Sequence, residues 1–382
     1  MTARGLRLLN ADCDGDVTGL RVQAGRIAAF AAPSPQDITL DLGGDRLLPG
    51  LINAHDHLQL NHFPRLRVRE RYTHAAQWIE DIRPRLGTDP LLIAGQAVPR
   101  EERLWLGGIK NLLSGVTTVA HHDPLYPALL DDGFPTRVVR EFGWAHSLTL
   151  EGGEAVRESH RQTPIGQPWI IHAAEGLDED ALAEFEQLET LGCIAANTLI
   201  VHGLALDTSR RARLAQAGAG LIWCPSSNLY LFDRTVDARD LIARGRVALG
   251  SDSRLTGERD LLAELDLARE LGELDEPVIE ALVTQRAAQL LRLPDRGVLA
   301  PGALADAVVL PAGLPLSRAS RANIRLVLLG GEVRYADPHY AQALGDAADL
   351  VPVQVDGRDK FLSRAIAARL SASTLHETGL IL

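Results

Sequence analysis

Short apolar runs alternate with amphipathic segments of helical length through the middle of the chain. Five of these runs are GVTTVAHH (115–122), PWIIHAAE (168–175), TLIVHGLAL (198–206), AGLIWCPSSN (219–228) and RVALGSDS (246–253). Strands that alternate with helices of about 10 to 15 residues are typical of βαβ units around a parallel sheet. The number of units favours a (β/α)8-type TIM barrel over a small doubly wound sheet, and no G-x-G-x-x-G follows the first strand.

Composition narrows the class of protein further. The 382 residues carry a formal charge of −11, which disfavours nucleic acid and anionic membranes as partners because both require a basic face. The sequence contains no run of about 18 apolar residues, so no membrane-spanning helix is predicted. The N-terminus lacks the apolar core of a signal peptide. Cys13, Cys193 and Cys224 are few and widely spaced, as in reduced thiols. We therefore expect a cytoplasmic protein whose partner is neither nucleic acid nor a membrane.

Polar residues with metal-binding chemistry stand where the apolar runs end. A single histidine at a strand end is more often a satisfied core residue, but here five strands end in this way. The carboxyl ends of parallel barrel strands converge on one face, so these side chains would surround one point. Imidazoles with a carboxylate form a ligand set for a divalent transition metal. The residues are His55 and His57, His121 and His122, His172, His202, and Asp252.

Spacing indicates which of these side chains face the same way. Residues i and i+2 of a strand share a face, so His55 and His57 both point into the predicted barrel mouth, whereas Asp56 points away. Glu175 follows His172 by three residues, and a carboxylate at that place can transfer protons beside the metal.

The sequence resembles the amidohydrolase superfamily, in particular its cytosine deaminase-like and chlorohydrolase-like branch. The matching motifs span nearly the whole chain and occur in the family's order. They are LLPGLINAHDH, LLSGVTTV, IIHAAEG, IVHGLAL, WCPSSNLYL, LGSDS, TQRAAQLL, DRGVLAPGALADAVVL and VLLGGEVRY.

The resemblance implies a site and a domain organisation. His55, His57, His172 and Asp252 would bind one divalent ion, with zinc favoured and iron as the alternative; Glu175, His202 and Asp252 would be catalytic. No lysine lies in GVTTVAHHDP, so a carboxylated lysine bridging two metals is not expected; the nearest lysine, Lys110, lies in the preceding helix. Residues 1–46 and 297–335 would form a small β-sandwich beside a barrel of residues 47–296. Residues 336–382 are predicted to form a C-terminal helical extension, which could pack on the barrel or on another subunit of a homo-oligomer.

The implied reaction is attack of a metal-activated water on a C–N bond. Deamination of a small amino-heterocycle is the favoured reaction. The alternative is hydrolysis of a cyclic amide or another non-peptide C–N bond at the same site. A non-catalytic scaffold is a remote third alternative, because the ligand positions, Glu175 and His202 are all present.

Two features remain open at this level. Only seven barrel strands are evident, near 51–55, 116–121, 138–145, 169–172, 199–202, 220–224 and 247–251. The family usually has a further strand before IIHAAEG, often ending in a substrate-binding histidine; here that strand is either compressed into 149–167 or the barrel is distorted.

The substrate contacts are the second open feature. Trp78 is predicted to cover the substrate, with core packing as the alternative. His121 and His122 either contact substrate or are solvated loop residues. Arg254 would bind an anionic group of the substrate, unless it pairs with Glu258 or Asp260.

Overall fold

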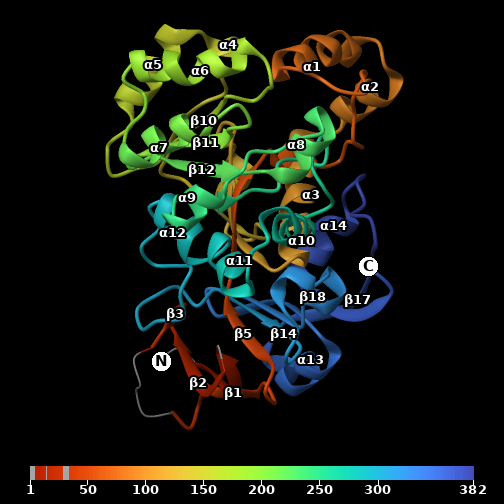
Figure 1. Ribbon diagram of the computed structural model, residues 1–382. Coiled ribbons are helices and arrows are strands. Elements are labelled where there is room, and N and C mark those ends of the chain that lie inside the picture. The colour runs from red at the N-terminus through yellow and green to blue at the C-terminus, as the bar shows by residue number, and fades with distance from the viewer. Residues whose placement is uncertain (1–4, 14, 29–33) are drawn as a thin grey trace.

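The computed structural model describes residues 5–13, 15–28 and 34–382. Its centre consists of two parallel sheets (Figure 1). One has the order β13-β12-β11-β10-β9 and the other the order β6-β7-β8. Their strands are β6 (Leu51–Asp56), β7 (Val116–His121), β8 (Arg137–Val138), β9 (Gly143–Ala145), β10 (Trp169–Ala173), β11 (Thr198–His202), β12 (Gly220–Trp223) and β13 (Val247–Leu249).

The segment predicted as a single third strand, 138–145, is two strands in the structure. β8 pairs in parallel with β7, whereas β9 pairs in parallel with β10 in the other sheet. The chain passes between the sheets over residues 139–142, which include the exposed Arg140. The fourth parallel strand is therefore β9, so of the two predicted alternatives the one that compresses this strand into 149–167 is wrong. That stretch instead forms α4 (Leu148–Glu151) and α5 (Gly153–Gln162).

Helices follow the strands of the larger sheet as the alternation predicts. They include α6 (Glu179–Thr190), α7 (Thr208–Gln216), α8 (Pro225–Phe232), α9 (Arg239–Ala243) and α10 (Leu261–Gly272), while α3 (Arg100–Leu113) precedes β7. Aspartates cap three of these helices: Asp178, Asp207 and Asp260 accept hydrogen bonds from main-chain N–H groups of the first turn. The apolar face of α6, with Phe185 and Leu188, is buried in the main hydrophobic core.

A mixed sheet of eleven strands joins the two ends of the chain (lower part of Figure 1). The join is made by β5 and β14, which pair antiparallel. The strands of this sheet are β1 (Leu6–Cys13), β2 (Asp16–Gln23), β3 (Arg26–Ile27), β4 (Ile38–Asp41), β5 (Arg46–Pro49), β14 (Ala307–Leu310), β15 (Leu326–Leu329), β16 (Glu332–Ala336), β17 (Leu350–Val355), β18 (Arg358–Ser363) and β19 (Leu380–Ile381).

The C-terminal segment differs from the helical extension predicted for 336–382. It does contain α13 (Pro338–Leu344) and α14 (Arg364–Ser371), but β17, β18 and β19 between and after them extend the mixed sheet. The reason is local: buried and exposed positions alternate along part of β17 and β18, a period of two that suits a strand. α14 is followed by Ser373, whose hydroxyl donates to Glu102 of α3 over 2.9 Å, so this end of the chain packs on a helix of the central part.

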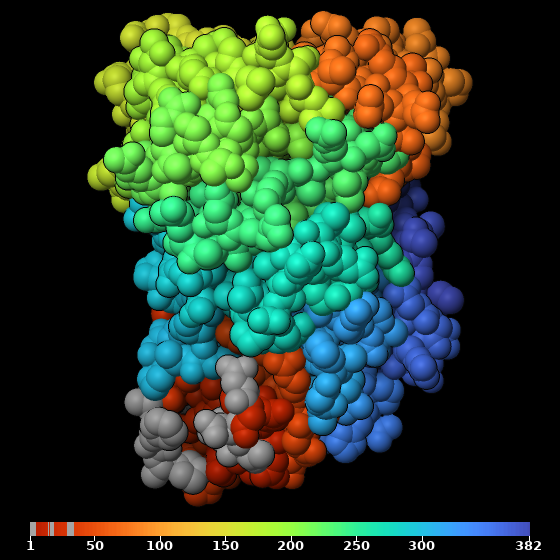
Figure 2. Space-filling view, in the orientation of Figure 1, coloured from red at the N-terminus to blue at the C-terminus, as the bar shows by residue number. Residues whose placement is uncertain are grey.

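A helical segment after β6 covers the carboxyl ends of the strands. It comprises α1 (Ala75–Ile82) and α2 (Pro90–Ala97), which lie at the top right of Figure 1. Its main chain is tied to the segment after β10, because Ala75 N donates to Glu175 O over 2.9 Å and Leu177 N donates to Thr73 O over 2.7 Å. Figure 2 shows its orange surface against the yellow-green surface of the chain that follows β9. Among the described residues, no helix is long and apolar enough to cross a membrane.

Candidate active site

A cavity of about 250 Å³ lies at the carboxyl ends of the parallel strands. The helical segment after β6 forms one wall with Ala75, Trp78 and Ile79, and the strand ends form the opposite wall. The strand-end residues that line it include His57, Asp123, His146, His172, Glu175, His202 and Asp252. The convergence of strand ends on one cavity is thus as predicted.

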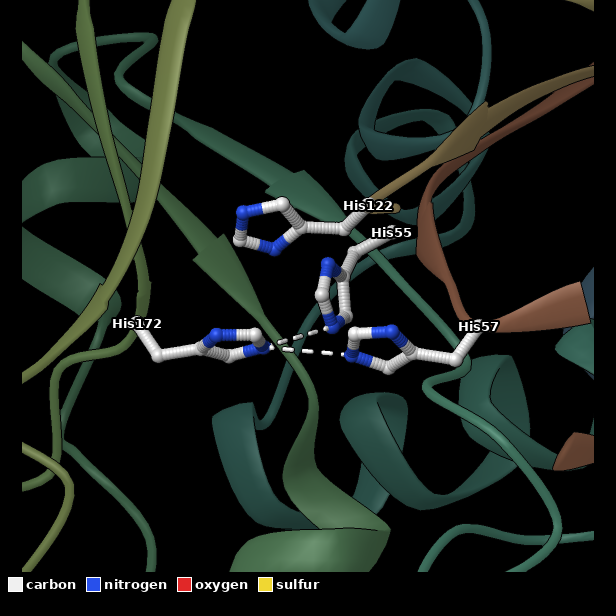
Figure 3. Close-up of side chains that lie close together, drawn as sticks. All are labelled: His55, His57, His122 and His172. Atoms are coloured by element: carbon white, nitrogen blue, oxygen red, sulfur yellow. Dashed lines mark hydrogen bonds between the residues drawn. The ribbon is translucent and has the colours of Figure 1, made fainter. Parts of the chain in front are cut away.

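Three imidazoles meet at the base of this cavity (Figure 3). Nε2 of His172 lies 3.3 Å from Nε2 of His57 and 3.3 Å from Nε2 of His55. A tetrahedral zinc ion with nitrogen ligands at about 2.0–2.1 Å would hold two such nitrogens roughly 3.4 Å apart. The spacing of the three nitrogens therefore fits a shared metal ion, in agreement with the sequence prediction that the chain can bind one.

The outer nitrogens of two of these rings define their tautomers. Nδ1 of His172 lies 2.8 Å from the main-chain oxygen of His146, and because a carbonyl only accepts, this Nδ1 carries the hydrogen. Nδ1 of His57 lies 2.7 Å from Oδ2 of Asp123 and donates to it. In their neutral forms His57 and His172 thus direct Nε2 lone pairs at each other, an arrangement that a cation between them would stabilise.

The electrostatic environment also favours a positive charge at this point. Burial lowers the pKa of His57, but the hydrogen bond from His57 to Asp123 and the charge of Asp123 outweigh this and raise that pKa to about 9. Burial holds the pKa of His55 and His172 well below the usual value, so these rings are neutral and their lone pairs are available. Two neutral imidazoles, and a third whose positive charge Asp123 stabilises, mark a point where a divalent ion could take the place of the proton of His57.

Two side chains are placed near enough to complete the ligand set. Oδ1 of Asp252 lies 3.9 Å from Nε2 of His55, and its carboxylate accepts from Ser253 N over 2.6 Å and from the Thr256 hydroxyl over 2.8 Å. His122 belongs with His55, His57 and His172 to a group whose ligand atoms all lie within 4.8 Å of one another. Its Nε2 meets the oxygen of Ala145 at 3.0 Å, which leaves the buried Nδ1 without a partner.

Glu175 and His202 face each other across the cavity. Nε2 of His202 lies 3.6 Å from Oε1 of Glu175, and Nδ1 of His202 lies 3.0 Å from Oδ1 of Asn228. Burial, with the charges of Asp252 and Glu184, raises the pKa of Glu175 well above its usual value. A carboxyl group with a raised pKa takes up a proton more readily than an ordinary glutamate, which suits a group that gives and takes protons.

The predicted substrate contacts fare unevenly. Trp78 lines the cavity and donates from Nε1 to Leu66 O over 2.8 Å. His121 and His122 are both buried, so neither is a solvated loop residue, and neither is among the cavity-lining residues. Nδ1 of His121 accepts from Leu58 N over 3.3 Å, which fixes its ring against the first turn after β6.

Arg254 does not enter the cavity, contrary to its predicted role. Its guanidinium donates to both carboxylate oxygens of Glu377, over 2.8 Å and 2.7 Å. Glu377 is fully buried in the C-terminal segment and also binds Arg321. The predicted alternative partners, Glu258 and Asp260, lie within six residues of Arg254 in the sequence. The actual partner, Glu377, lies 123 residues after it.

Several cavity residues were missed by the sequence analysis. His146 directly follows β9, at the place where the family often has a substrate-binding histidine, and was hidden because β9 was merged with β8. Asp123 orients His57 and accepts from Gln59 over 2.7 Å. His74 and Glu184 also line the cavity, and Glu184 accepts from Ala174 N over 2.7 Å. His146 and Asp123 both stand just after a strand end, and so carried a signal in the local sequence.

Comparisons with known proteins agree with this geometry. Residues 150–334 match the model of the amidohydrolase family. The 5-methylthioadenosine/S-adenosylhomocysteine deaminase of Halobacterium salinarum is 28% identical over 79% of this chain and 81% of its own length. The 8-oxoguanine deaminase of Pseudomonas aeruginosa is 26% identical over 75% of this chain and 80% of its own length. A crystal structure of an adenosine deaminase from Xanthomonas campestris with bound zinc has a TM-score of 0.70 at 18% identity, covering 86% of this chain and 92% of that one. The resemblance to the amidohydrolases is thereby confirmed.

Proposed function

We propose that this amidohydrolase is a mononuclear metal-dependent aminohydrolase that deaminates a small amino-heterocycle. The observation that carries the proposal is the convergence of the Nε2 atoms of His55, His57 and His172 beside a cavity that also holds Glu175 and His202. We propose Asp252 as the fourth ligand, because its carboxylate adds negative charge to three imidazole nitrogens. The two parallel sheets would then be two arcs of one barrel around this centre, with the mixed sheet as the accompanying sandwich.

The residues would divide the chemistry as follows. A divalent ion held by this set lowers the pKa of water and so supplies a nucleophile near neutral pH. Glu175 lies where it could accept one proton of that water and deliver it to the ring nitrogen; the second proton would pass to the amino group, so that the C–N bond breaks as ammonia departs and a carbonyl remains. Neutral His202 directs Nε2 into the cavity, since its Nδ1 donates to Asn228. Nε2 could accept a hydrogen bond from the attacking water, take up its second proton and pass that proton to the departing amino group.

The cavity favours a neutral and ring-sized substrate. Of the described residues that line it, none is lysine or arginine, and four are carboxylates: Asp123, Glu175, Glu184 and Asp252. A volume of about 250 Å³ is below the roughly 300–1,000 Å³ typical of pockets for drug-sized ligands. A free base such as the substrate named for the 8-oxoguanine deaminase therefore suits this cavity better than a nucleoside. The anionic substrate suggested by Arg254 has no cationic partner among these lining residues.

Ammonia release and metal content together test the proposal. Protein purified without chelator is analysed for metal and incubated with a panel of amino-heterocycles, their nucleosides, and cyclic amides. We expect one zinc per chain and ammonia from at least one neutral amino-heterocycle. Ring opening of a cyclic amide without ammonia would favour the alternative C–N hydrolysis, and a metal content near two per chain would contradict the mononuclear site.

A further inference from the structure

We call His55, His57, His122 and His172 the histidine cluster. Lys110 of α3 is fully buried directly behind it. Its Nζ lies 2.8 Å from Oδ1 of Asn61, 3.0 Å from Oγ of Ser251, 3.1 Å from Oδ2 of Asp56 and 3.2 Å from the main-chain oxygen of Asp252. An ammonium group has three hydrogens to donate, so these four acceptors satisfy it completely. A buried lysine is costly unless its charge is paired, and Asp56, also fully buried, supplies the paired charge.

The partners of Lys110 belong to the two segments that carry the proposed metal ligands. Asp56 stands between His55 and His57 at the end of β6, and Asp252 follows β13. In the sheets that the structure describes, β6 pairs with β7 and β13 pairs with β12, so no ladder joins these two edges. The ammonium group spans this gap.

Further polar contacts cross the same gap. Asn53 Nδ2 donates to Ser251 Oγ over 2.8 Å, Ser251 N donates to Asn53 Oδ1 over 3.0 Å, and Asp252 N donates to His55 O over 3.1 Å. Asn111 Nδ2 adds a hydrogen bond of 2.8 Å to Asp56. We call Asn53, Asp56, Asn61, Lys110, Asn111 and Ser251 the lysine network.

The main chain of Asp252 adds a reason for an anchor at this place. Asp252 has a φ of +51°, in the left-handed region that is unfavourable for a residue with a side chain. Its carbonyl oxygen accepts from both Lys110 and the Ser251 hydroxyl, the latter over 2.9 Å. These donors stabilise the turn from which the Asp252 carboxylate reaches the histidines.

We propose that Lys110 is a positioning residue that sets the distance between His55 and His57 on one side and Asp252 on the other. The inference rests on the metal site of the proposed function and goes beyond it, since Lys110 itself neither lines the cavity nor offers a ligand. Without the ammonium group, Asp56 keeps a buried charge with no cation, and the two strand ends lose their common donor. The metal site then loosens although every ligand remains.

The test compares two buried lysines. Lys110→Met removes the ammonium group behind the histidines. Lys360→Met removes one in the mixed sheet, where Lys360 donates to Asp337, to Ala322 O over 2.9 Å and to Ile324 O over 2.7 Å. Zinc affinity is measured by competition with a chelator, and Tm is measured with and without zinc. We expect Lys110→Met to weaken zinc binding by about 10- to 100-fold, the range for partners that orient metal ligands. Lys360→Met should lower Tm, but its zinc affinity should equal that of the wild type.

The outcomes separate the two proposals. Wild-type affinity in folded Lys110→Met would overturn the role of Lys110 and leave the metal site intact, whereas failure of the wild-type chain to bind zinc would overturn both. If Lys110→Met does not fold, Ser251→Ala tests the same contact, with Ser317→Ala as its control because the buried Ser317 hydroxyl donates to Glu276 in a distant part of the chain. Zinc binding weakened in Ser251→Ala alone supports the proposal, and equal affinities in the two serine variants contradict it.

Discussion

Two groups of buried polar side chains meet at the end of β6, and they differ in how far their hydrogen bonds are satisfied. In the lysine network each side chain has protein partners, and the N–H groups of Asn53, Lys110 and Asn111 point at oxygen acceptors of the same network. In the histidine cluster, Nδ1 of His55 and of His122 are buried without a partner, and Nε2 atoms face one another. Buried nitrogens normally face a partner of opposite character, so the Nε2 atoms that face one another mark the place where an external cation would complete the structure, while the lysine network is framework.

The largest effect should follow from removing a ligand of the histidine cluster. We expect His172→Ala to lose zinc and to reduce kcat/KM by at least about 10³-fold, because water that is not activated by a metal has a pKa near 15.7 rather than about 7. Metal analysis and ammonia release measure both effects.

The control for this variant is His376→Ala, which removes an exposed histidine. It should retain metal and activity. If His172→Ala kept the zinc content and turnover of the wild type, the histidine cluster would not be the site that binds the catalytic metal.

The next largest effect separates proton transfer from metal binding. Glu175→Gln should lower kcat by about 10²- to 10⁴-fold, the usual contribution of a general acid–base group, because an amide cannot carry the proton. Zinc content should not change, since Glu175 is not among the proposed ligands. Glu179→Gln, at an exposed position on α6, serves as the control. Unchanged kcat in Glu175→Gln on an established substrate would exclude the assigned role.

A buried group that does not line the cavity should affect stability more than activity. Burial raises the pKa of Glu264 to about 8, although hydrogen bonds from Ser226 partly oppose this. The folded state thus holds a proton that the unfolded chain releases near pH 4.5, so this contribution to stability is complete below that pH and is lost as the pH rises to about 8.

We therefore expect the wild-type free energy of unfolding to fall between pH 5 and pH 8 by an amount on the order of a few kcal/mol from this group. Glu264→Gln should remove that part of the slope. Urea unfolding at several pH values measures it, with Glu70→Gln at an exposed position as the control. Identical slopes for Glu264→Gln and the wild type would show that Glu264 does not titrate in this range.

The smallest effect on catalysis is expected at Arg254. Arg254→Met leaves the buried Glu377 with Arg321 as its remaining cationic partner, so it should destabilise the fold by an amount on the order of 1–3 kcal/mol. It should change kcat/KM equally little for neutral and for anionic compounds. A selective loss for anionic compounds, measured in the same assay, would restore the role predicted from sequence.

Local pattern was sufficient for much of the fold and for part of the site. The alternation of apolar runs and helices predicted the parallel strands, and the i, i+2 spacing placed His55 and His57 together, as their Nε2 contacts with His172 bear out. It failed at 137–145, because a short apolar run carries no mark of where one strand ends and the next begins. It also failed for β17 and β18, where the period-two pattern is short and flanked by helical segments.

The sequence by itself determined which residue types stand at the strand ends, since strand direction and side-chain alternation are local properties of the backbone. Only the tertiary structure decided the partners. Arg254 pairs with Glu377, Lys110 binds across the gap between β6 and β13, and His122 joins the histidine cluster. These choices depend on side chains more than 50 residues apart coming within a few ångströms. That proximity follows from the packing of the whole chain, because burial makes each charge and each hydrogen-bond donor pair with whichever partner the fold brings within reach.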